Sequence, residues 1–355
     1  MVNPESMTKF KSNDIFHIFL FFATIIIFIF SIFASISGYI RPHHFKFISL
    51  TNNLLPITLG ALSILLIIWL IRKRWVFIFP LIGIAVNINT IFSIIQPRAE
   101  REPFAADLNS SIKVISFNVH DFIYSKSYDE VAEINEFINS EKPDILCIQE
   151  FETPGYLNDN EMHSYFSHFS AKYIEKTTQE KLGLAIMSVY NISDKGVVDF
   201  EGTSNRIIWA DLITDRGKIR VINCHLQTTG LARASKNGTN FLKRINELME
   251  NNKIRATQAE AVKVIINSTP FPVVVCGDFN DTPSSYTYTT IKGENMTDGF
   301  RQAGSGFAGT YKGISGLFRI DYIFHSDHFR SIRYRTPETN HSDHKPVISE
   351  LVYKN

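Results

Sequence analysis

Three long apolar stretches near the N-terminus constrain this chain more than any other feature. They occupy about residues 15–40, 54–72 and 76–96, and none contains Asp, Glu, Lys or Arg before Arg41, Arg72 and Arg98 close them. About 20 apolar residues are needed for a helix to cross a bilayer, so each stretch is long enough or nearly so. A cleaved signal peptide is the weaker interpretation of the first stretch, because its apolar run is too long and no small-residue cleavage site follows. We predict a membrane anchor of three transmembrane helices over residues 1–97.

Basic residues between the stretches predict the orientation of this anchor. The cluster Arg72-Lys73-Arg74 separates the second stretch from the third, and such clusters favour the cytoplasmic side of a membrane. With three spans, the remainder of the chain then lies on the opposite side. We therefore expect a multi-pass protein of the inner (cell) membrane with a periplasmic or extracytoplasmic C-terminal domain.

The remainder of the chain has the mixed composition of a folded domain. We predict a linker over residues 98–110 and one large domain over residues 111–355. After Glu102, 27 Lys and Arg stand against 31 Asp and Glu, a net charge of −4. This balance lacks the basic excess that marks a dedicated duplex-DNA binder. The three cysteines, Cys147, Cys224 and Cys276, lie in apolar strand patterns, so we expect small buried side chains rather than a disulfide framework.

Several strands predicted in this domain end in polar residues that can bind a metal or a phosphate. The segment from Val273 to Pro283 reads VVVCGDFNDTP, a β-branched run that ends in Asp278 and Asn280. Residues two apart on a strand share a face, so these side chains can act at one site. An Asx turn at the end of a strand explains Gly-Asp-Phe-Asn equally well when the segment is taken alone. Two earlier strands end in a similar way, at Asn118 and at Glu150.

Two histidines, His225 and His344, are also candidates for the site. Residues 206–213 and 218–226 predict a hairpin whose second strand delivers His225. Asp321 falls inside an apolar strand, where an unpaired carboxylate would cost several kcal/mol. His344 is the partner that we expect for it. A histidine held by a buried carboxylate has a fixed orientation and can stay protonated near neutral pH.

The tetrapeptide His-Ser-Asp-His occurs twice, at residues 325–328 and 341–344. The second copy runs into a predicted strand that begins after Pro346, whereas the first runs into Phe329-Arg330 and further charge. A following strand can hold the second copy against a core. We predict that His344 is functional and that His328 is not.

Seven short motifs occur in one order between residues 112 and 352. They are Ser116-Phe-Asn118, Ile148-Gln-Glu150, Gly183-Leu-Ala-Ile-Met-Ser188, Asn223-Cys-His225, Gly277-Asp-Phe-Asn280, Arg319-Ile-Asp-Tyr322 and Ser342-Asp-His344. Together these motifs resemble the endonuclease/exonuclease/phosphatase superfamily, and the three spans followed by such a domain resemble membrane-anchored members from Bacteroidetes-type bacteria. The resemblance implies an α/β fold, a four-layer α/β sandwich of two mixed β-sheets flanked by helices, preceded by three transmembrane helices.

The resemblance also implies a role for each matching residue. Glu150 is the principal metal ligand, with Asn118 and Asp343 close to the metal or the phosphate. Oxygen ligands of this kind suit Mg²⁺, with Mn²⁺ as an alternative. Asp278 and Asn280 position or activate the attacking water, and Arg206 contacts the phosphate. His225 and His344 stabilise the charge that develops on the phosphate and transfer protons, and Asp321 orients His344. Asp278 and His344 both remain candidates for the general base.

The chain differs from one branch of the superfamily, the apurinic-site endonucleases, at two positions. Apurinic-site endonucleases carry an Asp where this chain has His120, and they lack the histidine present here as His225. Asp121 lies one position too late to replace that Asp without a bulge. The chain is therefore more similar to the deoxyribonuclease, sphingomyelinase and inositol-phosphatase branches.

These observations favour a membrane-anchored, Mg²⁺-dependent phosphodiesterase or phosphatase that uses a metal-assisted attack of water. We expect a lipid head group or a small nucleotide as substrate rather than duplex DNA. An extracytoplasmic endonuclease or exonuclease is the first alternative, with a basic patch at Arg233, Lys236, Lys243 and Arg244. A non-catalytic, membrane-bound binding module is the second, although such a protein need not keep Glu150.

Overall fold

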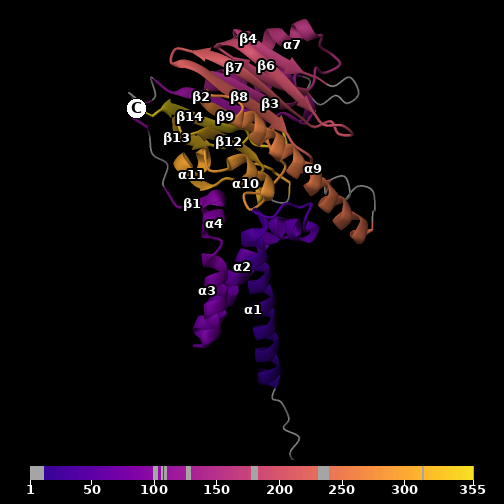
Figure 1. The fold of residues 1–355 in the computed structure, drawn as a ribbon, viewed down its shortest axis with the longest axis vertical. Coiled ribbons are helices and arrows are strands. Elements are labelled where there is room, and N and C mark those ends of the chain that lie inside the picture. The colour runs from indigo at the N-terminus through magenta and orange to yellow at the C-terminus, as the bar shows by residue number, and fades with distance from the viewer. Residues whose placement is uncertain are drawn as a thin grey trace, which may run out of the picture.

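The computed structural model describes residues 12–98, 103–104, 107, 110–124, 129–176, 183–230, 240–313 and 316–354. It places a group of apolar helices beneath a domain built on two β-sheets (Figure 1). Residues 99–102, 105–106 and 108–109 of the expected linker lie outside the described residues.

Two of the N-terminal helices, α1 (Ser12–Ser37) and α2 (Ser49–Ile71), are long and apolar enough to cross a membrane. Helix α1 rises toward the domain and α2 leads away from it again (Figure 1). Between them lies the short 3-10 helix η1 (Lys46–Ile48). Because most apolar side chains of α1 and α2 have no core to enter, many of them are exposed.

The third apolar stretch, predicted as one helix over residues 76–96, is instead broken. It forms η2 (Trp75–Phe77), α3 (Ile78–Ala85) and α4 (Ile88–Ile94), with a bend of 57° before α4. Asn87 lies at the break, and its side chain donates to the backbone oxygens of Gly83 at 2.8 Å and Ser31 at 3.1 Å. Such a bond to the carbonyl four residues earlier competes with the regular helix. The described chain therefore has two continuous candidate spans, or three if the bent pair counts as one.

The domain contains two six-stranded mixed sheets, which confirms the predicted fold. The first has the order β10-β12-β9-β8-β7-β6 and the second the order β13-β14-β2-β3-β5-β4. Only β8–β9 and β2–β3 pair in parallel within these sheets. The strands of the first sheet are β6 (Asn191–Asp199), β7 (Arg206–Thr214), β8 (Gly217–His225), β9 (Val273–Asp278), β10 (Met296–Asp298) and β12 (Asp321–Ser326). Those of the second are β2 (Ile112–Asn118), β3 (Ile145–Phe151), β4 (Ala171–Glu175), β5 (Gly183–Ser188), β13 (Phe329–Arg335) and β14 (Val347–Tyr353).

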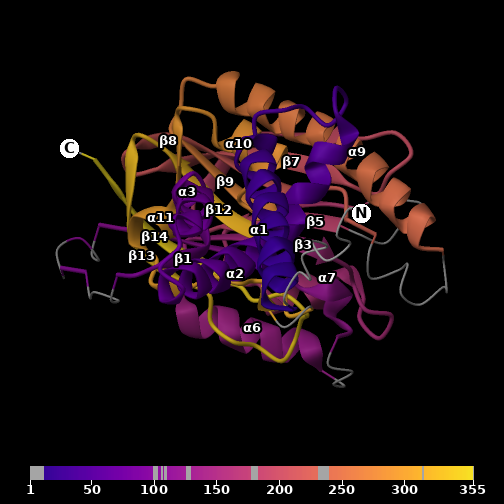
Figure 2. The ribbon, with the colours of Figure 1, turned by 90° about the horizontal axis from the view of Figure 1, so that it is seen from below.

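Three apolar clusters hold the layers together. One cluster lies between the sheets and joins residues such as Ile186 and Val274. The second sheet is covered by α6 (Glu130–Glu141) and α7 (Asp159–Tyr165), and the first by α9 (Phe241–Asn267) and α10 (Tyr286–Lys292). Figure 2 shows α9 and α6 on opposite sides of the strands. The three cysteines are free and buried, as expected.

A small two-stranded sheet connects the N-terminal helices to the domain. Strand β1 (Ile95–Gln96) follows α4 and pairs antiparallel with β11 (Gly306–Phe307). The short helix α11 (Gly299–Ala303) precedes β11 and contacts α4. The N-terminal helices and the domain therefore meet through backbone pairing as well as side chains.

Candidate active site

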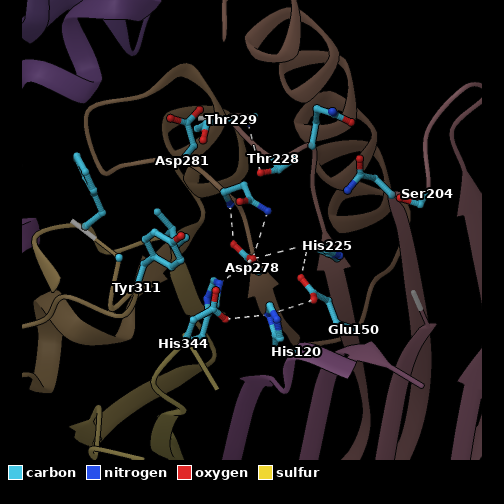
Figure 3. Close-up of a pocket in the computed structure, with 18 of the residues that line it drawn as sticks. His120, Glu150, Ser204, His225, Thr228, Thr229, Asp278, Asp281, Tyr311 and His344 are labelled. Atoms are coloured by element: carbon cyan, nitrogen blue, oxygen red, sulfur yellow. Dashed lines mark hydrogen bonds and ion pairs between the residues drawn. The ribbon is translucent and has the colours of Figure 1, made fainter. Parts of the chain in front are cut away.

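A cavity of about 740 Å³ lies where strand ends of the two sheets meet (Figure 3). Among the residues that the structure describes, no Lys or Arg lines it. Its titratable lining consists of five carboxylates, three histidines and a tyrosine: Asp121, Glu150, Asp278, Asp281, Asp343, His120, His225, His344 and Tyr311. A phosphate entering such a cavity would meet excess negative charge unless a cation accompanied it.

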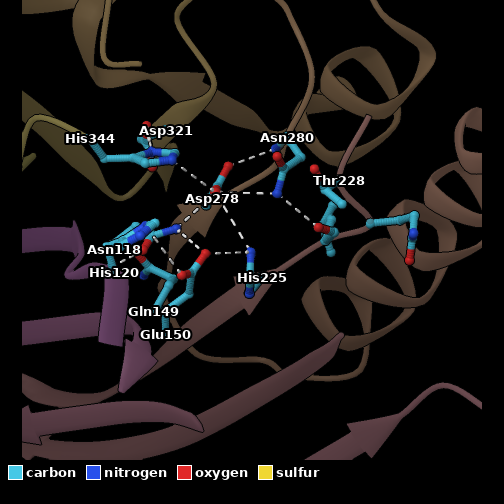
Figure 4. Close-up of polar contacts among 12 residues, drawn as sticks. Asn118, His120, Gln149, Glu150, His225, Thr228, Asp278, Asn280, Asp321 and His344 are labelled. Carbon is cyan, nitrogen blue, oxygen red and sulfur yellow. Dashed lines mark hydrogen bonds and ion pairs between the residues drawn. The ribbon is translucent and has the colours of Figure 1, made fainter. Parts of the chain in front are cut away.

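Asn118 connects the two sheets at the floor of the site. It is buried at the end of β2, and its Nδ2 donates to Glu150 Oε1 at 3.0 Å and to Asp278 Oδ2 at 3.1 Å (Figure 4). Its Oδ1 accepts the backbone N–H of His120 at 3.1 Å. One amide thus fixes the spacing between two carboxylates that belong to different sheets.

A bulge in β3 turns Glu150 into the cavity. The register with β5 shifts between Gln149 and Phe151, and Glu150 has a φ of 54°. Bulges of this kind redirect a side chain next to active sites. Glu150 Oε1 lies 3.6 Å from His225 Nε2, at the end of β8. The sequence therefore identified both residues but gave no sign of the bulge that brings them together.

Asp278 and Asn280 form a rigid unit after β9. The N–H of Asn280 donates to Asp278 Oδ1 at 2.8 Å, and its Nδ2 donates to Oδ2 at 3.2 Å and to the oxygen of Leu226 at 3.0 Å. Gly277 has a φ of 144°, and a Cβ there would lie 2.0 Å from the oxygen of Cys224. Only glycine therefore lets β9 approach β8 this closely. Burial and the nearby Asp321 raise the pKa of Asp278 to about 6.

Asp321 and His344 form the buried pair that the sequence predicts. His344 Nδ1 lies 2.9 Å from Asp321 Oδ2, and Asp321 is opposite Asp278 in the register of β12 and β9. Burial opposes the charged imidazolium, but the carboxylates of Asp321 and Asp278 outweigh it and raise the pKa of His344 to about 10. Asp278, Asp321 and His344 could themselves hold a metal ion by their spacing. Because His344 Nδ1 is already bonded to Asp321, the Glu150 side of the cavity is the better-fitting place for a cation.

The segment after Asn118 contributes His120 and Asp121, to which the motifs assign no role. In η3 (His120–Phe122), all three residues have positive φ values, 49°, 58° and 58°. His120 Nδ1 lies 3.1 Å from Asp343 Oδ1 and 3.9 Å from Glu150 Oε2. The hydrogen bond that the His120 ring donates to the Asp343 carboxylate raises the pKa of His120 against the opposing effect of burial.

Asp121 enters the cavity through the same left-handed turn. Its Oδ1 is buried and has no hydrogen-bond partner in the described part of the chain. Burial and the charge of Glu150 raise the pKa of Asp121 to about 6. Left-handed backbone is uncommon for residues other than glycine, which explains why spacing alone could not place this side chain.

Arg206 follows Asn205 of the cavity lining but does not itself line the cavity. Although it is opposite His225 in the register of β7 and β8, it does not belong to the lining, and its Nη2 pairs with Asp199 Oδ1 at 2.7 Å. Conversely, Tyr311 lines the cavity with its ring centre 5.2 Å from that of His344. No local pattern in the sequence marked this tyrosine.

Of the expected basic patch, Arg233 and Lys236 lie outside the described residues. Lys243 and Arg244 lie near the start of α9 and do not line the cavity.

Two buried residues of α9 hold the loops that follow β8 and β9. Arg255 Nε donates to Asp281 Oδ2 at 3.0 Å, and its Nη1 donates to the oxygen of Gln227 at 2.5 Å. Gln258 Oε1 accepts the N–H of Gln227 at 2.7 Å. The loops that carry Asn280 and follow His225 are therefore fixed to the same helix.

Two family models match the chain. The Endonuclease/Exonuclease/phosphatase family matches residues 115–344. A Domain of unknown function (DUF8431) matches residues 17–94. No curated protein matches the chain.

Solved structures share the fold of the domain. An endonuclease/exonuclease/phosphatase from Bacteroides vulgatus has a TM-score of 0.55 at 18% identity, covering 69% of this chain and 100% of that chain. The corresponding protein from Beutenbergia cavernae has a TM-score of 0.53 at 18% identity, covering 69% and 72%. The human Nocturnin catalytic domain with a bound sulfate anion has a TM-score of 0.52 at 16% identity, covering 69% and 94%. At these identities the likeness concerns the fold alone.

Proposed function

The chain belongs to the endonuclease/exonuclease/phosphatase family, and on that basis we propose that it is a membrane-anchored, metal-dependent phosphodiesterase or phosphatase. The observation that carries this proposal is the meeting of Glu150, His225, Asp278 and His344 in one cavity, although they come from four segments far apart in the sequence. A protein that only bound a ligand would not need this set of carboxylates and histidines.

The donor set fits a hard divalent cation such as Mg²⁺. Glu150, Asp343 and Asn118 would hold it, and Asp121 offers a further buried oxygen without a hydrogen-bond partner among the described residues. Oxygen donors with one or two carboxylates are what Mg²⁺ prefers. A bound cation would supply positive charge to the phosphoryl oxygens. The described lining contains no Lys or Arg that could do so.

Asp278 and His344 have different roles in the proposed proton transfers. With a pKa of about 6, Asp278 is a carboxylate at neutral pH and can accept a proton from water, while Asn280 and Asn118 fix its orientation. With a pKa of about 10, His344 is an imidazolium that can stabilise negative charge or donate a proton. We therefore assign Asp278 as the general base. His225, between Glu150 and Asp278 at 3.6 and 3.7 Å, is placed to contact the phosphate.

The cavity weighs against duplex DNA as the main substrate. A protein that neutralises many phosphates would present Lys and Arg along its site, whereas the described lining contains neither. We therefore keep the nuclease as the second candidate, behind a small or lipid-borne phosphoester.

We propose that the helices α1, α2 and the bent pair α3–α4 anchor the chain in the cell membrane. The succession of helices toward and away from the domain fits three crossings, with Arg72-Lys73-Arg74 at the far end of α2 (Figure 1). A cytoplasmic position for this cluster places the domain outside the cytoplasm. Alkaline carbonate should leave the protein in the membrane fraction, and its release into the soluble fraction would refute the anchor.

The catalytic proposal is tested with the purified full chain on a panel of lipid, nucleotide, sugar and nucleic-acid phosphoesters. We expect release of phosphate, or of the esterified alcohol, with Mg²⁺ and none with EDTA. A rate that EDTA leaves unchanged would contradict the metal requirement. No turnover of any phosphoester would contradict the proposal as a whole.

A further inference from the structure

The anchor contributes to the wall of the catalytic cavity. Asn53, in the second turn of α2, lines the same cavity as Asp278 and His344. Its side chain is half-buried, and no hydrogen bond joins it to another residue that the structure describes. The neighbouring Asn52 and Leu55 line a smaller cavity together with residues 282–284 and 317–319 of the domain. A helix from the membrane part therefore faces the site directly.

Specific contacts hold α1 and the segment before α2 against the domain. Arg41 Nη2 pairs with Glu260 Oε2 of α9 at 2.7 Å, and Tyr286 donates to the other oxygen of Glu260 at 2.9 Å. Ser37 Oγ donates to the oxygen of Ser284 at 3.2 Å. A Cβ added to Gly38 would lie 2.6 Å from Thr289 Oγ1. These contacts reach the residues that follow the catalytic strand β9, so the position of the anchor is coupled to the site.

The position of Asn53 on α2 fixes the depth of the cavity relative to a bilayer. The residues from Leu54 to Ile71 are an unbroken apolar stretch that ends at Arg72. At about 1.5 Å per residue, these 18 residues extend for about 27 Å, close to the thickness of the hydrocarbon layer. Asn53 then lies where the hydrocarbon layer ends and the head groups begin.

The surface around this junction has the character of a membrane interface. Tyr39, Phe45 and Phe47 are exposed to 78%, 48% and 54%, and Lys46 lies 5.5 Å from the ring of Phe47. Aromatic side chains of this kind concentrate at the level of lipid head groups. On the domain side, Phe307 and Leu317 are also exposed. Figure 2 shows α1, α2 and α3 grouped beneath the sheets of the domain.

The lining of the cavity suits a head group that carries few charges. Beyond the carboxylates and histidines, it offers uncharged hydroxyl and amide groups from the loops after β6 and β8. They are Thr203, Ser204, Asn205, Gln227, Thr228 and Thr229. Such groups bind hydroxyls and single phosphates through hydrogen bonds without requiring a polyanion.

We infer that the cavity receives the phosphoester head group of a membrane lipid whose acyl chains stay in the bilayer, with Asn53 contributing a hydrogen bond from the anchor. This inference rests on the proposed phosphoesterase activity and adds a substrate class and a residue to it. A lipid in the same membrane as the anchor is held near the site at high effective concentration.

The test compares substrates with one head group and two chain lengths. The full chain is reconstituted in phosphatidylcholine vesicles and supplied with dioleoyl or dihexanoyl phosphatidic acid, a monoester, and with dioleoyl or dihexanoyl phosphatidylglycerol, a diester. The dihexanoyl compounds are kept in their monomeric range. For the head group that is hydrolysed, we expect kcat/KM at least tenfold higher with the dioleoyl lipid.

The variant Asn53→Ala tests the residue itself. Loss of one hydrogen bond should lower kcat/KM for the dioleoyl lipid about three- to tenfold, and it should lower the rate on bis(p-nitrophenyl) phosphate or p-nitrophenyl phosphate by less, because these compounds are smaller than the lipid head group with its chains. Asn89→Ala is the matched control, because Asn89 lies in α4 near the domain but does not line the cavity. It should match the wild type on every substrate.

The outcomes separate this inference from the proposed function. Equal rates on both chain lengths, or an Asn53→Ala variant that matches the wild type on the lipid, would overturn the inference and leave the phosphoesterase intact. If no phosphoester is hydrolysed, including the nitrophenyl compounds, the proposed function fails and the inference fails with it.

Discussion

The two copies of His-Ser-Asp-His have the same sequence but lie in different structural surroundings. In the first, His325 is buried in β12, and His328 lies exposed in the turn before β13. In the second, Asp343 and His344 line the cavity, and Ser342 Oγ donates to the oxygen of Asn118 at 2.7 Å. The same tetrapeptide therefore forms part of a turn in one place and part of the candidate active site in the other.

The two buried histidines, His325 and His344, differ in pKa because their neighbours differ. Burial lowers the pKa of His325, whose Nε2 contacts the neutral Gln302 Oε1 at 3.0 Å. His344 is buried as well, but the carboxylates of Asp321 and Asp278 raise its pKa to about 10. A histidine in the core is thus neutral or charged according to its partner, and only the charged one is placed to act on a phosphate.

The largest effect should come from the last histidine of each copy. In His344→Ala, loss of the imidazolium should lower kcat by on the order of 10²- to 10⁴-fold, the range for a residue that transfers protons. His328→Ala should keep the rate of the wild type, because His328 is exposed outside the cavity. Steady-state kinetics on the best substrate of the panel measures both. Equal losses would show that the copies are not different in function.

The aspartates of the two copies should differ in their effect on metal use. Asp343→Ala removes a proposed ligand, so we expect on the order of 10- to 100-fold more Mg²⁺ to be needed for half-maximal rate, the scale seen for residues around metal sites. Asp327→Ala should leave this concentration unchanged, because Asp327 is exposed and lies 3.9 Å from Lys354 Nζ. If the Mg²⁺ dependence of Asp343→Ala equals that of the wild type, Asp343 is not a ligand.

Removal of Asp321 should shift the pH profile. The wild type has His344 protonated up to about pH 10 and Asp278 ionised above about pH 6. In Asp321→Asn both pKa values fall, since Asp321 raises each of them. The variant should therefore lose activity as the pH rises from neutral to 9, while its acidic limb moves to lower pH. The matched control Asp327→Asn should keep the wild-type profile, and an unshifted profile for Asp321→Asn would separate Asp321 from the proton transfers.

The smallest effects should come from the first histidine of each copy. His325→Ala removes the contacts of this buried ring with Gln302 Oε1 and with the oxygen of Ser326, which should lower the free energy of unfolding by about 1–3 kcal/mol with kcat unchanged. His341→Ala removes only a half-buried pair with Glu133 at 3.2 Å, for which we expect less than about 1 kcal/mol. Thermal unfolding in detergent measures both. A large loss of kcat in either variant would place these histidines in the mechanism.

Much of the site could be predicted because it rests on side chains at strand ends. Asn118, Glu150, His225 and Asp278 follow apolar strand patterns, and the need of buried Asp321 for a partner leads to His344. What could not be predicted depends on backbone irregularities or on distant segments. The bulge at Glu150 and the left-handed turn at Asp121 have no glycine to signal them.

The remaining differences depend on tertiary contacts. Asn53 lies in an apolar helix more than 200 residues from Asp278 in the sequence, and Tyr311 lies in a loop. Arg206 matches a family position, but its pairing with Asp199 was not visible in the sequence. The sequence did contain a signal for the break at Asn87, namely an amide residue within an apolar stretch. A prediction made from length and hydropathy alone does not take this amide into account.

A Mg²⁺ titration of the wild type and of Glu150→Gln, with the full chain and one hydrolysed phosphoester, shows whether the cavity is a metal-dependent catalytic site. Glu150 is 18% exposed in its side chain and its change to an isosteric amide should leave the fold intact, which thermal unfolding can verify. We expect a saturable Mg²⁺ dependence in the wild type, no activity in EDTA, and a variant that needs far more Mg²⁺ and turns over at least about 100-fold more slowly, because the cation loses its charged ligand. If the variant, or the EDTA-treated wild type, hydrolyses the substrate at the original rate, the site does not work through a metal ion held by Glu150.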